Sequence, residues 1–271
     1  GIGKMLKGPT GETIDTHAQP KSVKITDDGV HFRSPIDGKE HYLSPKTSIR
    51  IQEALGADIM FAFDECVSPV ATKDYMLASL KKTHRWAKEC LDAKKTKQAL
   101  YGIVQGGAFR DLRIESARTI GSMPFDGFAV GGEFGYDKKI MAKLIGWVVD
   151  VLPTERPRHA LGIGHPEDFE PLARAGVDTF DCIAPTHYAR RGTIFTSRGR
   201  IDIRKQKFLK DKKPLDSSCA CGVCQTYTRS YLSHLLRASE QTGMRLASFH
   251  NLYFFNEQAR LLRKRIKNGE L

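Results

Sequence analysis

Three cysteines in the last third of the chain are spaced as metal ligands. Cys219, Cys221 and Cys224 are separated by one and two residues, and His250 follows after residues 225–249. Thiolates this close on a turn converge, and tetrahedral Zn²⁺ accepts three thiolates together with one imidazole. Because four protein ligands leave no open coordination position, the pattern predicts a closed, structural zinc site.

Two alternatives to this ligand set are weighed. His234 is the other candidate for the fourth ligand, but we expect it to be packed or solvent-facing in the middle of a helix. The cysteines could instead be free core thiols, although scattered core thiols seldom fall at ligand spacing. The remaining cysteines, Cys66, Cys90 and Cys182, are interpreted chiefly as small hydrophobic residues.

A second group of candidate residues lies where short apolar segments end. It comprises Asp64 and Cys66 after segment 58–63, Gln105 after 99–104, Gly131 and Gly132 after 127–130, and Asp181 within 177–184. Taken singly, Asp64 or Asp181 could be a carboxylate that caps the next helix. Two such carboxylates at strand ends beside glycine-rich turns favour a functional site. The neighbouring acid Glu65 is expected to face solvent.

The elements that position these residues alternate regularly. Helical patterns occupy the intervals between the apolar segments, over 72–91, 109–121, 138–152 and 166–175. This alternation predicts an α/β fold of parallel β/α units, and active sites of β/α barrels lie at the carboxyl ends of the strands. A full eight-stranded barrel takes ~250 residues. Since only about five units precede residue 185, either the sheet is open or the first part of a barrel is missing.

Further elements flank this region. Segments 29–32 and 40–43 predict a β-hairpin, and Ser44-Pro45 predicts a helix that ends at Gly56. Two short strands are expected near residues 193–204. Helices are expected over 225–241 and 251–267.

The charge of the chain favours a polyanionic partner. The 271 residues include 43 Lys and Arg against 31 Asp and Glu, a net charge of +12, and segment 185–215 is strongly basic. The alternative is a basic surface with no special role. We find neither a membrane-spanning run nor a signal-peptide pattern, so we expect a cytoplasmic protein with no membrane partner.

Longer stretches of the sequence resemble tRNA-guanine transglycosylases. They are SPIDGKEHYLSP, DIMFAFDEC, YGIVQGG, FDGFAVGG, LGIGHPEDF, GVDTFDCIAPT, CACGVCQTYTRSYLSHLL and ASFHNLYF, in the order and spacing of that family. The resemblance implies an irregular (β/α)8 TIM-type barrel with a zinc-binding subdomain. It divides the chain into a barrel portion, 1–215, and a zinc-binding helical subdomain, 216–271. The implied activity is exchange of guanine at the anticodon wobble position for a 7-deazaguanine base.

The resemblance also implies a role for each candidate residue. Asp181 matches the nucleophile that would capture the ribose covalently. The guanine-type base would be bound by Asp64, Gln105, Gly131 and Gly132, with Cys66 and Gly135 beside it. Phosphates of the anticodon loop would contact Arg190, Arg191 and His187, although members often have Arg at the position of His187. The helices of the zinc region commonly mediate a homodimer in this family.

The sequence departs from the family pattern in two further places. The Asp-Ser-Gly-Gly segment that precedes the family's hairpin is not present, so we expect a cropped chain. Glu133-Phe134-Gly135 replaces Leu-Ala-Val after the paired glycines. Glycine at position 135 makes room for a larger base, so we hypothesise that queuine is accepted. The alternatives to the enzyme are a non-catalytic RNA-binding subunit and a relative that inserts deazaguanine into DNA.

Overall fold

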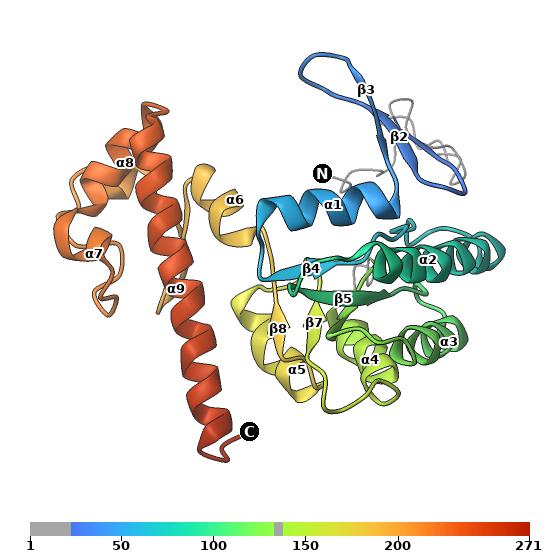
Figure 1. The fold of residues 1–271 in the computed structure, drawn as a ribbon. Helices are drawn as coiled ribbons and strands as arrows, with labels where there is room; N and C mark the ends of the chain where they lie inside the picture. Colours follow the sequence, from blue (N-terminus) through green and yellow to red (C-terminus); the bar gives the residue numbers. More distant parts are fainter. Residues whose placement is uncertain (1–22, 133–137) are drawn as a thin grey trace. The chain divides into compact units, whose positions relative to one another are not determined.

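The structure is a computed structural model that describes residues 23–132 and 138–271. The chain divides into two compact units. The first extends to Leu161 and includes Ala175–Thr179, and the second comprises Gly162–Arg174 and Phe180–Leu271 (Figure 1). Each unit is described by itself. The division into 1–215 and 216–271 stays a prediction.

A parallel sheet is the centre of the α/β fold. Its strands follow the order β4 (Ile59–Phe61), β5 (Ala99–Val104), β6 (Gly127–Val130), β7 (Arg158–Ala160) and β8 (Thr179–Phe180). The pairs β4–β5, β5–β6 and β6–β7 are parallel. β6 is buried along its whole length and β5 along nearly all of it, as expected for strands covered on both faces. The predicted fold class is confirmed, and the parallel sheet is that of a TIM-type fold.

Helices connect these strands. They are α2 (Lys73–Ala93), α3 (Arg110–Gly121) and α4 (Lys138–Val149), and each contacts the next (Figure 1). α2 begins where the Thr72 side chain accepts a hydrogen bond from the Tyr75 N–H, and it buries Met76 and Leu80 one turn apart. This spacing places the apolar side chains of the helix on one face.

The predicted hairpin and the helix after it are confirmed. β2 (Val30–Arg33) pairs antiparallel with β3 (Glu40–Leu43), and β1 (Val23–Ile25) adds a third strand. α1 (Pro45–Leu55) has Ser44 as its N-cap, and Gly56 ends it with a φ of 72°. Proline at the first helical position and a left-handed glycine at the end are the signals from which this helix was predicted.

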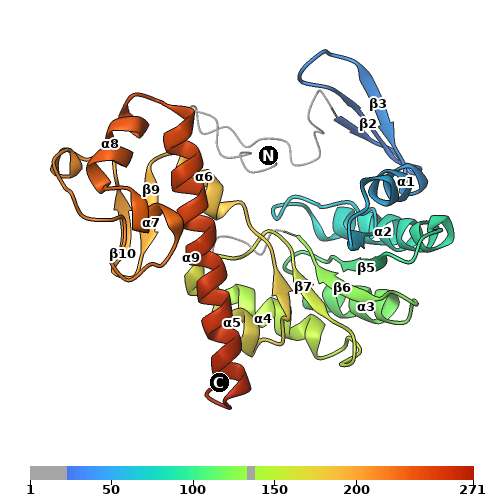
Figure 2. The ribbon, with the colours of Figure 1, turned by 60° about the vertical axis from the view of Figure 1, so that its left-hand side comes forward.

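The second unit combines short helices with a two-stranded sheet. Its elements are η1 (Pro166–Asp168), α5 (Phe169–Arg174), α6 (Ala184–Arg190), β9 (Thr193–Thr196), β10 (Gly199–Asp202), η2 (Gln206–Phe208), α7 (Gly222–Thr226), α8 (Arg229–Arg237) and α9 (Gln241–Lys267). β9 pairs antiparallel with β10, and α9 contacts α6, α7, α8 and β9 (Figure 2). Ile194, Ile203, Phe208, Leu215 and Leu232 belong to the core of this unit.

The start of the last helix was predicted wrongly. α9 begins at Gln241 rather than at Asn251, and it runs without a break through Gly243 and His250. A glycine inside a helical pattern lowers its apparent propensity. Here it serves packing, because a Cβ on Gly243 would lie 2.7 Å from the Cβ of Leu235 on α8. Within the described ranges, no helix combines the length and the apolar character needed to cross a membrane.

Candidate functional site

The three predicted cysteines and His250 converge in the second unit. Nδ1 of His250 lies 3.8 Å from Sγ of Cys219, 3.4 Å from Sγ of Cys221 and 3.3 Å from Sγ of Cys224. All four side chains are buried, and their ligand atoms lie within 4.8 Å of one another. His234 is exposed on α8 and lies outside this group. The four residues could therefore hold a metal ion with three sulfurs and one nitrogen.

The start of α7 favours the thiolate form of Cys221. Cys221 is the N-cap of α7, and its Sγ accepts a hydrogen bond of 3.4 Å from the N–H of Cys224. Hydrogen bonding from the Cys224 side chain, against the effect of burial, lowers the pKa of the Cys221 thiol. A thiolate is the form that binds a metal, so this position favours coordination.

The second ring nitrogen of His250 fixes the orientation of the imidazole. Nε2 lies 2.8 Å from the carbonyl oxygen of Phe195 in β9. A carbonyl only accepts hydrogen bonds, so Nε2 carries the proton and Nδ1 presents its lone pair to the thiols. An outer partner of this kind is typical of histidines that bind metals.

Asp64 and Gln105 meet in the first unit. Nε2 of Gln105 donates a hydrogen bond of 2.6 Å to Oδ2 of Asp64. Burial, together with the smaller effect of the Glu65 charge, raises the pKa of Asp64 to about 6 against the opposing hydrogen bond from Gln105. At neutral pH the carboxylate is mostly ionised, so it can accept hydrogen bonds from a ligand.

Both predicted glycines lie against Gln105. A Cβ on Gly131 would lie 2.6 Å from Nε2 of Gln105, and one on Gly132 would lie 2.8 Å from its Oε1. Gly132 also has a φ of 93°, which disfavours other residues. Glycine at both positions lets the backbone approach the Asp64–Gln105 pair. The structure thus brings four of the predicted base-binding residues together, while Gly135 lies outside the described residues.

Arg113 belongs to this group and was missed in the sequence. It lies on α3 and is fully buried. Its Nε donates 2.7 Å to the carbonyl of Gly107, and its Nη1 donates 2.9 Å to the carbonyl of Gly131. Arg113 therefore ties the loop after β5 to the loop after β6. Burial lowers its pKa to about 10, so the side chain stays charged at neutral pH.

Two neighbours of Asp64 differ in their surroundings. Glu65, expected to face solvent, is only 3% exposed. It accepts a hydrogen bond of 2.7 Å from the Tyr75 hydroxyl and lies 3.2 Å from Nζ of Lys82. These partners from α2 offset the cost of burying the carboxylate. Cys66 is exposed.

Asp181 lies in the second unit, directly after β8. Its carboxylate is exposed, and Oδ1 accepts a hydrogen bond of 3.1 Å from the N–H of Gly162. The neighbouring Cys182 is half-buried, and its Sγ donates 2.9 Å to the carbonyl of Gly164. Asp181 is therefore an oriented carboxylate that remains accessible to a ligand.

The predicted RNA-contacting residues gather at the end of α6. Nη1 of Arg191 lies 3.1 Å from Nδ1 of His187, while Arg190 and Arg191 are both exposed. Desolvation and the charges of the two arginines lower the pKa of His187. The imidazole is therefore neutral at pH 7, and its Nδ1 can accept the hydrogen bond from Arg191.

Known proteins are similar to this chain over most of its length. The family described as queuine tRNA-ribosyltransferase matches residues 12–271. The putative queuine tRNA-ribosyltransferase of Archaeoglobus fulgidus is 45% identical over 92% of this chain and 64% of its own length. The queuine tRNA-ribosyltransferase of Halalkalibacterium halodurans is 44% identical, over 91% of this chain and 66% of its own length. That of Bacillus subtilis is 43% identical, over 93% of this chain and 67% of its own length. The chain thus spans about two thirds of the length of these relatives. It belongs to the queuine tRNA-ribosyltransferase family.

Proposed function

We propose that the protein is a tRNA-guanine transglycosylase. It would exchange guanine at the anticodon wobble position of tRNA for a 7-deazaguanine base. The observation that carries this proposal is the Asp64 carboxylate, which is held by the Gln105 amide beside Gly131 and Gly132. Membership of the family supports the same activity.

The chemistry of guanine matches the Asp64 group. A carboxylate accepts hydrogen bonds from the adjacent ring N–H and exocyclic NH₂, which guanine and 7-deazaguanine share. Backbone amides near Gly131 and Gly132 would donate to the carbonyl edge of the base. Arg113 would hold the loop after β5 and the loop after β6 in fixed positions without touching the base itself.

Asp181 would act as the nucleophile. Its carboxylate forms a bond to C1′ of the ribose as the bond from C1′ to N9 of guanine breaks. The electron pair leaves with N9, which takes up a proton. The incoming base loses its N9 proton, attacks C1′ and releases the carboxylate. Each bond that is broken is replaced, so the exchange needs no ATP.

We also propose that the Cys219, Cys221, Cys224 and His250 group holds Zn²⁺. The donor set of three thiolates and one imidazole suits zinc, and four protein ligands make the ion structural. The ion would stabilise the second unit, and it would take no part in the exchange.

A denaturing gel tests the activity. After incubation with tRNA, the wild-type protein should leave a covalent RNA adduct, and Asp181→Asn should not. Radiolabelled guanine should enter tRNA and not duplex DNA. An RNA that binds without forming an adduct would instead indicate the non-catalytic RNA-binding subunit, and label in DNA would indicate the DNA-modifying relative.

Two finer proposals concern the substrate and the assembly. Gly135 would leave room for the larger 7-substituent of queuine, so exchange should be faster with queuine than with 7-aminomethyl-7-deazaguanine. A clear preference for the smaller base would contradict this. A homodimer is proposed by analogy with the family, and sedimentation equilibrium of the full chain would measure it.

A further inference from the structure

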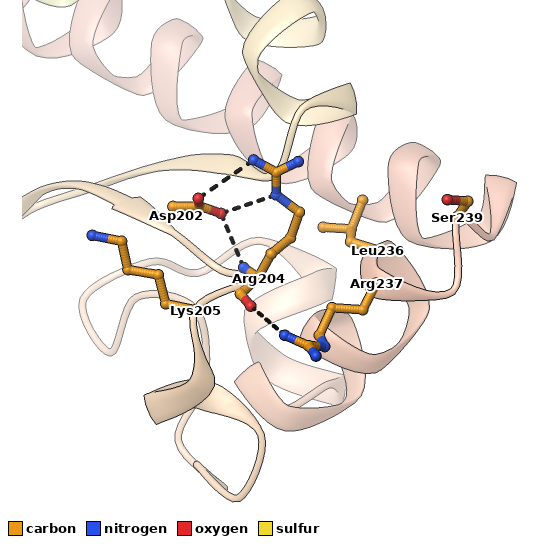
Figure 3. Close-up of a pocket in the computed structure, with 6 residues that line it drawn as sticks. All are labelled: Asp202, Arg204, Lys205, Leu236, Arg237 and Ser239. Carbon is orange, nitrogen blue, oxygen red and sulfur yellow. Dashed lines mark hydrogen bonds and ion pairs between the residues drawn. The ribbon is translucent and has the colours of Figure 1, made fainter.

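A basic pocket in the second unit has no role in the proposed exchange. Its volume is about 500 Å³, and it is lined by Asp202, Arg204, Lys205, Leu236, Arg237 and Ser239 (Figure 3). Three of these side chains are cationic and one is anionic. We refer to these six residues as the basic pocket.

The carboxylate in the pocket is neutralised by its neighbour. Oδ1 of Asp202 lies 3.1 Å from Nε of Arg204, and Oδ2 lies 3.4 Å from Nη2 (Figure 3). This hydrogen bonding holds the pKa of Asp202 below its usual range, so the pair is charged and internally balanced. The charges of Lys205 and Arg237 are therefore in excess, and the pocket carries a net positive charge that suits an anion.

The position of the two arginines is fixed by the backbone. Nη1 of Arg237 donates 3.0 Å to the carbonyl of Arg204, which joins α8 to the segment after β10 (Figure 3). The Arg204 side chain packs over Gly192, where a Cβ would lie only 2.7 Å from Nε. Gly192 has a φ of 81°, so the chain uses glycine where Arg204 needs this space.

The segment that carries Arg204 and Lys205 lies beside the residue that follows α6. Gly192 directly follows Arg191, and its carbonyl accepts a hydrogen bond of 2.9 Å from the N–H of Ile203. Arg190 and Arg191, the proposed phosphate contacts, therefore adjoin the segment that carries Arg204 and Lys205. A polyanion held at α6 could continue into the basic pocket.

Ser239 provides an independent observation. Its φ is 60°, and among the described residues it alone is a non-glycine with a positive φ. It occupies the turn after α8, where its N–H donates to the carbonyl of Leu236, and glycine is the usual residue at such a helix end. Strained residues that persist tend to lie at functional sites. Serine here adds a hydroxyl to the wall of the pocket (Figure 3).

We propose that the basic pocket binds a backbone phosphate of the RNA substrate, as a second phosphate site beside Arg190 and Arg191. The identity of the RNA as tRNA rests on the proposed function. Lys205 and Arg237 would contact the phosphate, and the Ser239 hydroxyl would donate a hydrogen bond. The volume accommodates a nucleotide.

Salt dependence of tRNA binding tests this site. The logarithm of the association constant falls linearly with the logarithm of salt concentration, with a slope of about 0.7 to 0.9 per phosphate contact. Lys205→Gln with Arg237→Gln should reduce the magnitude of the slope by about that amount or more, and raise Kd roughly five- to tenfold at low salt. Arg237→Lys, which keeps the charge, should recover most of the affinity.

Arg263→Gln with Lys264→Gln is the matched control. Both residues are exposed near the end of α9, roughly 33 Å along the helix from Gln241 at 1.5 Å per residue. This variant removes the same charges and should keep the wild-type slope. If the pocket variant and the control variant bind tRNA alike, the basic pocket is not a phosphate site. If the pocket variant changes self-association and leaves tRNA binding intact, the surface serves protein contacts and the proposal is wrong.

Two measurements distinguish a failure of the proposed phosphate site from a failure of the proposed base exchange. At saturating tRNA the pocket variant should keep the kcat of base exchange and raise only the KM for tRNA. A wild-type protein that exchanges no base but binds tRNA through the pocket would refute the proposed function alone. Should Arg237→Gln fail to fold, Lys205→Gln and Ser239→Gly are the replacement variants. Lys205→Gln should weaken binding and lower the slope, whereas Ser239→Gly, which removes no charge, should weaken binding at an unchanged slope. Unchanged binding in both variants would refute the site.

Discussion

The ring of His250 joins the cysteine cluster to the strand that follows α6. Its Nδ1 faces the three thiols, while its Nε2 lies 2.8 Å from the carbonyl oxygen of Phe195. The next residue, Asn251, is fully buried and binds the same region through its side chain. The cysteine cluster and the proposed RNA-contacting helix are therefore mechanically connected.

Metal removal should act on RNA binding through this connection. A strong chelator is expected to release about one zinc per chain, reduce the helical signal and weaken tRNA binding. Loss of the ion leaves three thiols and an imidazole facing one another in the core, which destabilises the second unit. Elemental analysis, circular dichroism and tRNA binding measure the three effects. Full tRNA affinity in a protein shown to be metal-free would contradict the connection.

Asn251→Ala should destabilise the protein by about 3 kcal/mol, because it removes three hydrogen bonds made by a fully buried side chain. Its Oδ1 accepts from the N–H of Phe195, and its Nδ2 donates to the carbonyls of Pro185 and Thr193, each at 3.0 Å. The control is Asn256→Ala on the same helix. Asn256 is exposed and bonds only locally to Leu252 among the described contacts, so its substitution should change stability by less than about 0.5 kcal/mol. Equal urea midpoints for the two variants would refute the role of Asn251.

Arg113→Gln should weaken guanine binding by more than about tenfold and destabilise the protein by about 2 kcal/mol or more, because the carbonyls of Gly107 and Gly131 lose charged donors. Arg118→Gln removes an exposed arginine from the same helix and should leave both properties unchanged. Calorimetry with guanine and thermal unfolding measure the two quantities. Guanine affinity that survives in a folded Arg113→Gln protein would show that Arg113 does not position the base site.

Base binding should weaken on acidification, because the pKa of Asp64 is raised to about 6 by burial. The ionised carboxylate accepts the hydrogen bonds of the base, so affinity should be full near pH 8 and fall as the pH drops through about 6. Asp64→Asn should bind weakly with little pH dependence between pH 5 and 8. A wild-type affinity that stays constant over this range would contradict the role of the carboxylate.

The raised pKa of Asp64 has the opposite effect on protein stability, which should fall with rising pH while base binding strengthens. A carboxyl whose pKa is higher in the folded than in the unfolded protein disfavours folding once it ionises. The contribution of Asp64 to stability is therefore lost as the pH rises from about 4 to about 6. Asp64→Asn should unfold at a higher temperature than the wild type at pH 8, with the difference vanishing near pH 4. If Asp64→Asn is less stable than the wild type at pH 8, burial of the ionised Asp64 carboxylate does not destabilise the native protein.

Local signals explain what could be predicted from the sequence. Ser44, Pro45 and Gly56 define both ends of α1, and the spacing of Cys219, Cys221 and Cys224 predicted a cluster that the structure brings together. Asp64, Gln105 and the paired glycines were expected at strand ends, and they lie together because parallel strands end at one edge of a sheet.

Tertiary contacts explain the features that could not be predicted from the sequence. An arginine in a helical pattern normally extends into solvent, so nothing in the residues around Arg113 indicates that it is buried between two loops. Glu65 is buried because Tyr75 and Lys82 on α2 satisfy it. The last helix was predicted to begin too late because the role of Gly243, which packs against Leu235 on a different helix, depends on a tertiary contact.

The contacts of Asn251 also set an order of events during synthesis of the chain. The carbonyls of Pro185 and Thr193 are satisfied by a side chain that lies 66 and 58 positions further on. A growing chain on the ribosome cannot complete this part of the protein until α9 has emerged and docked. Surface arginines around α6 therefore acquire their final arrangement late, after His250 of the cysteine cluster has been translated. A nascent chain that is released early would carry the basic segment without the geometry to use it.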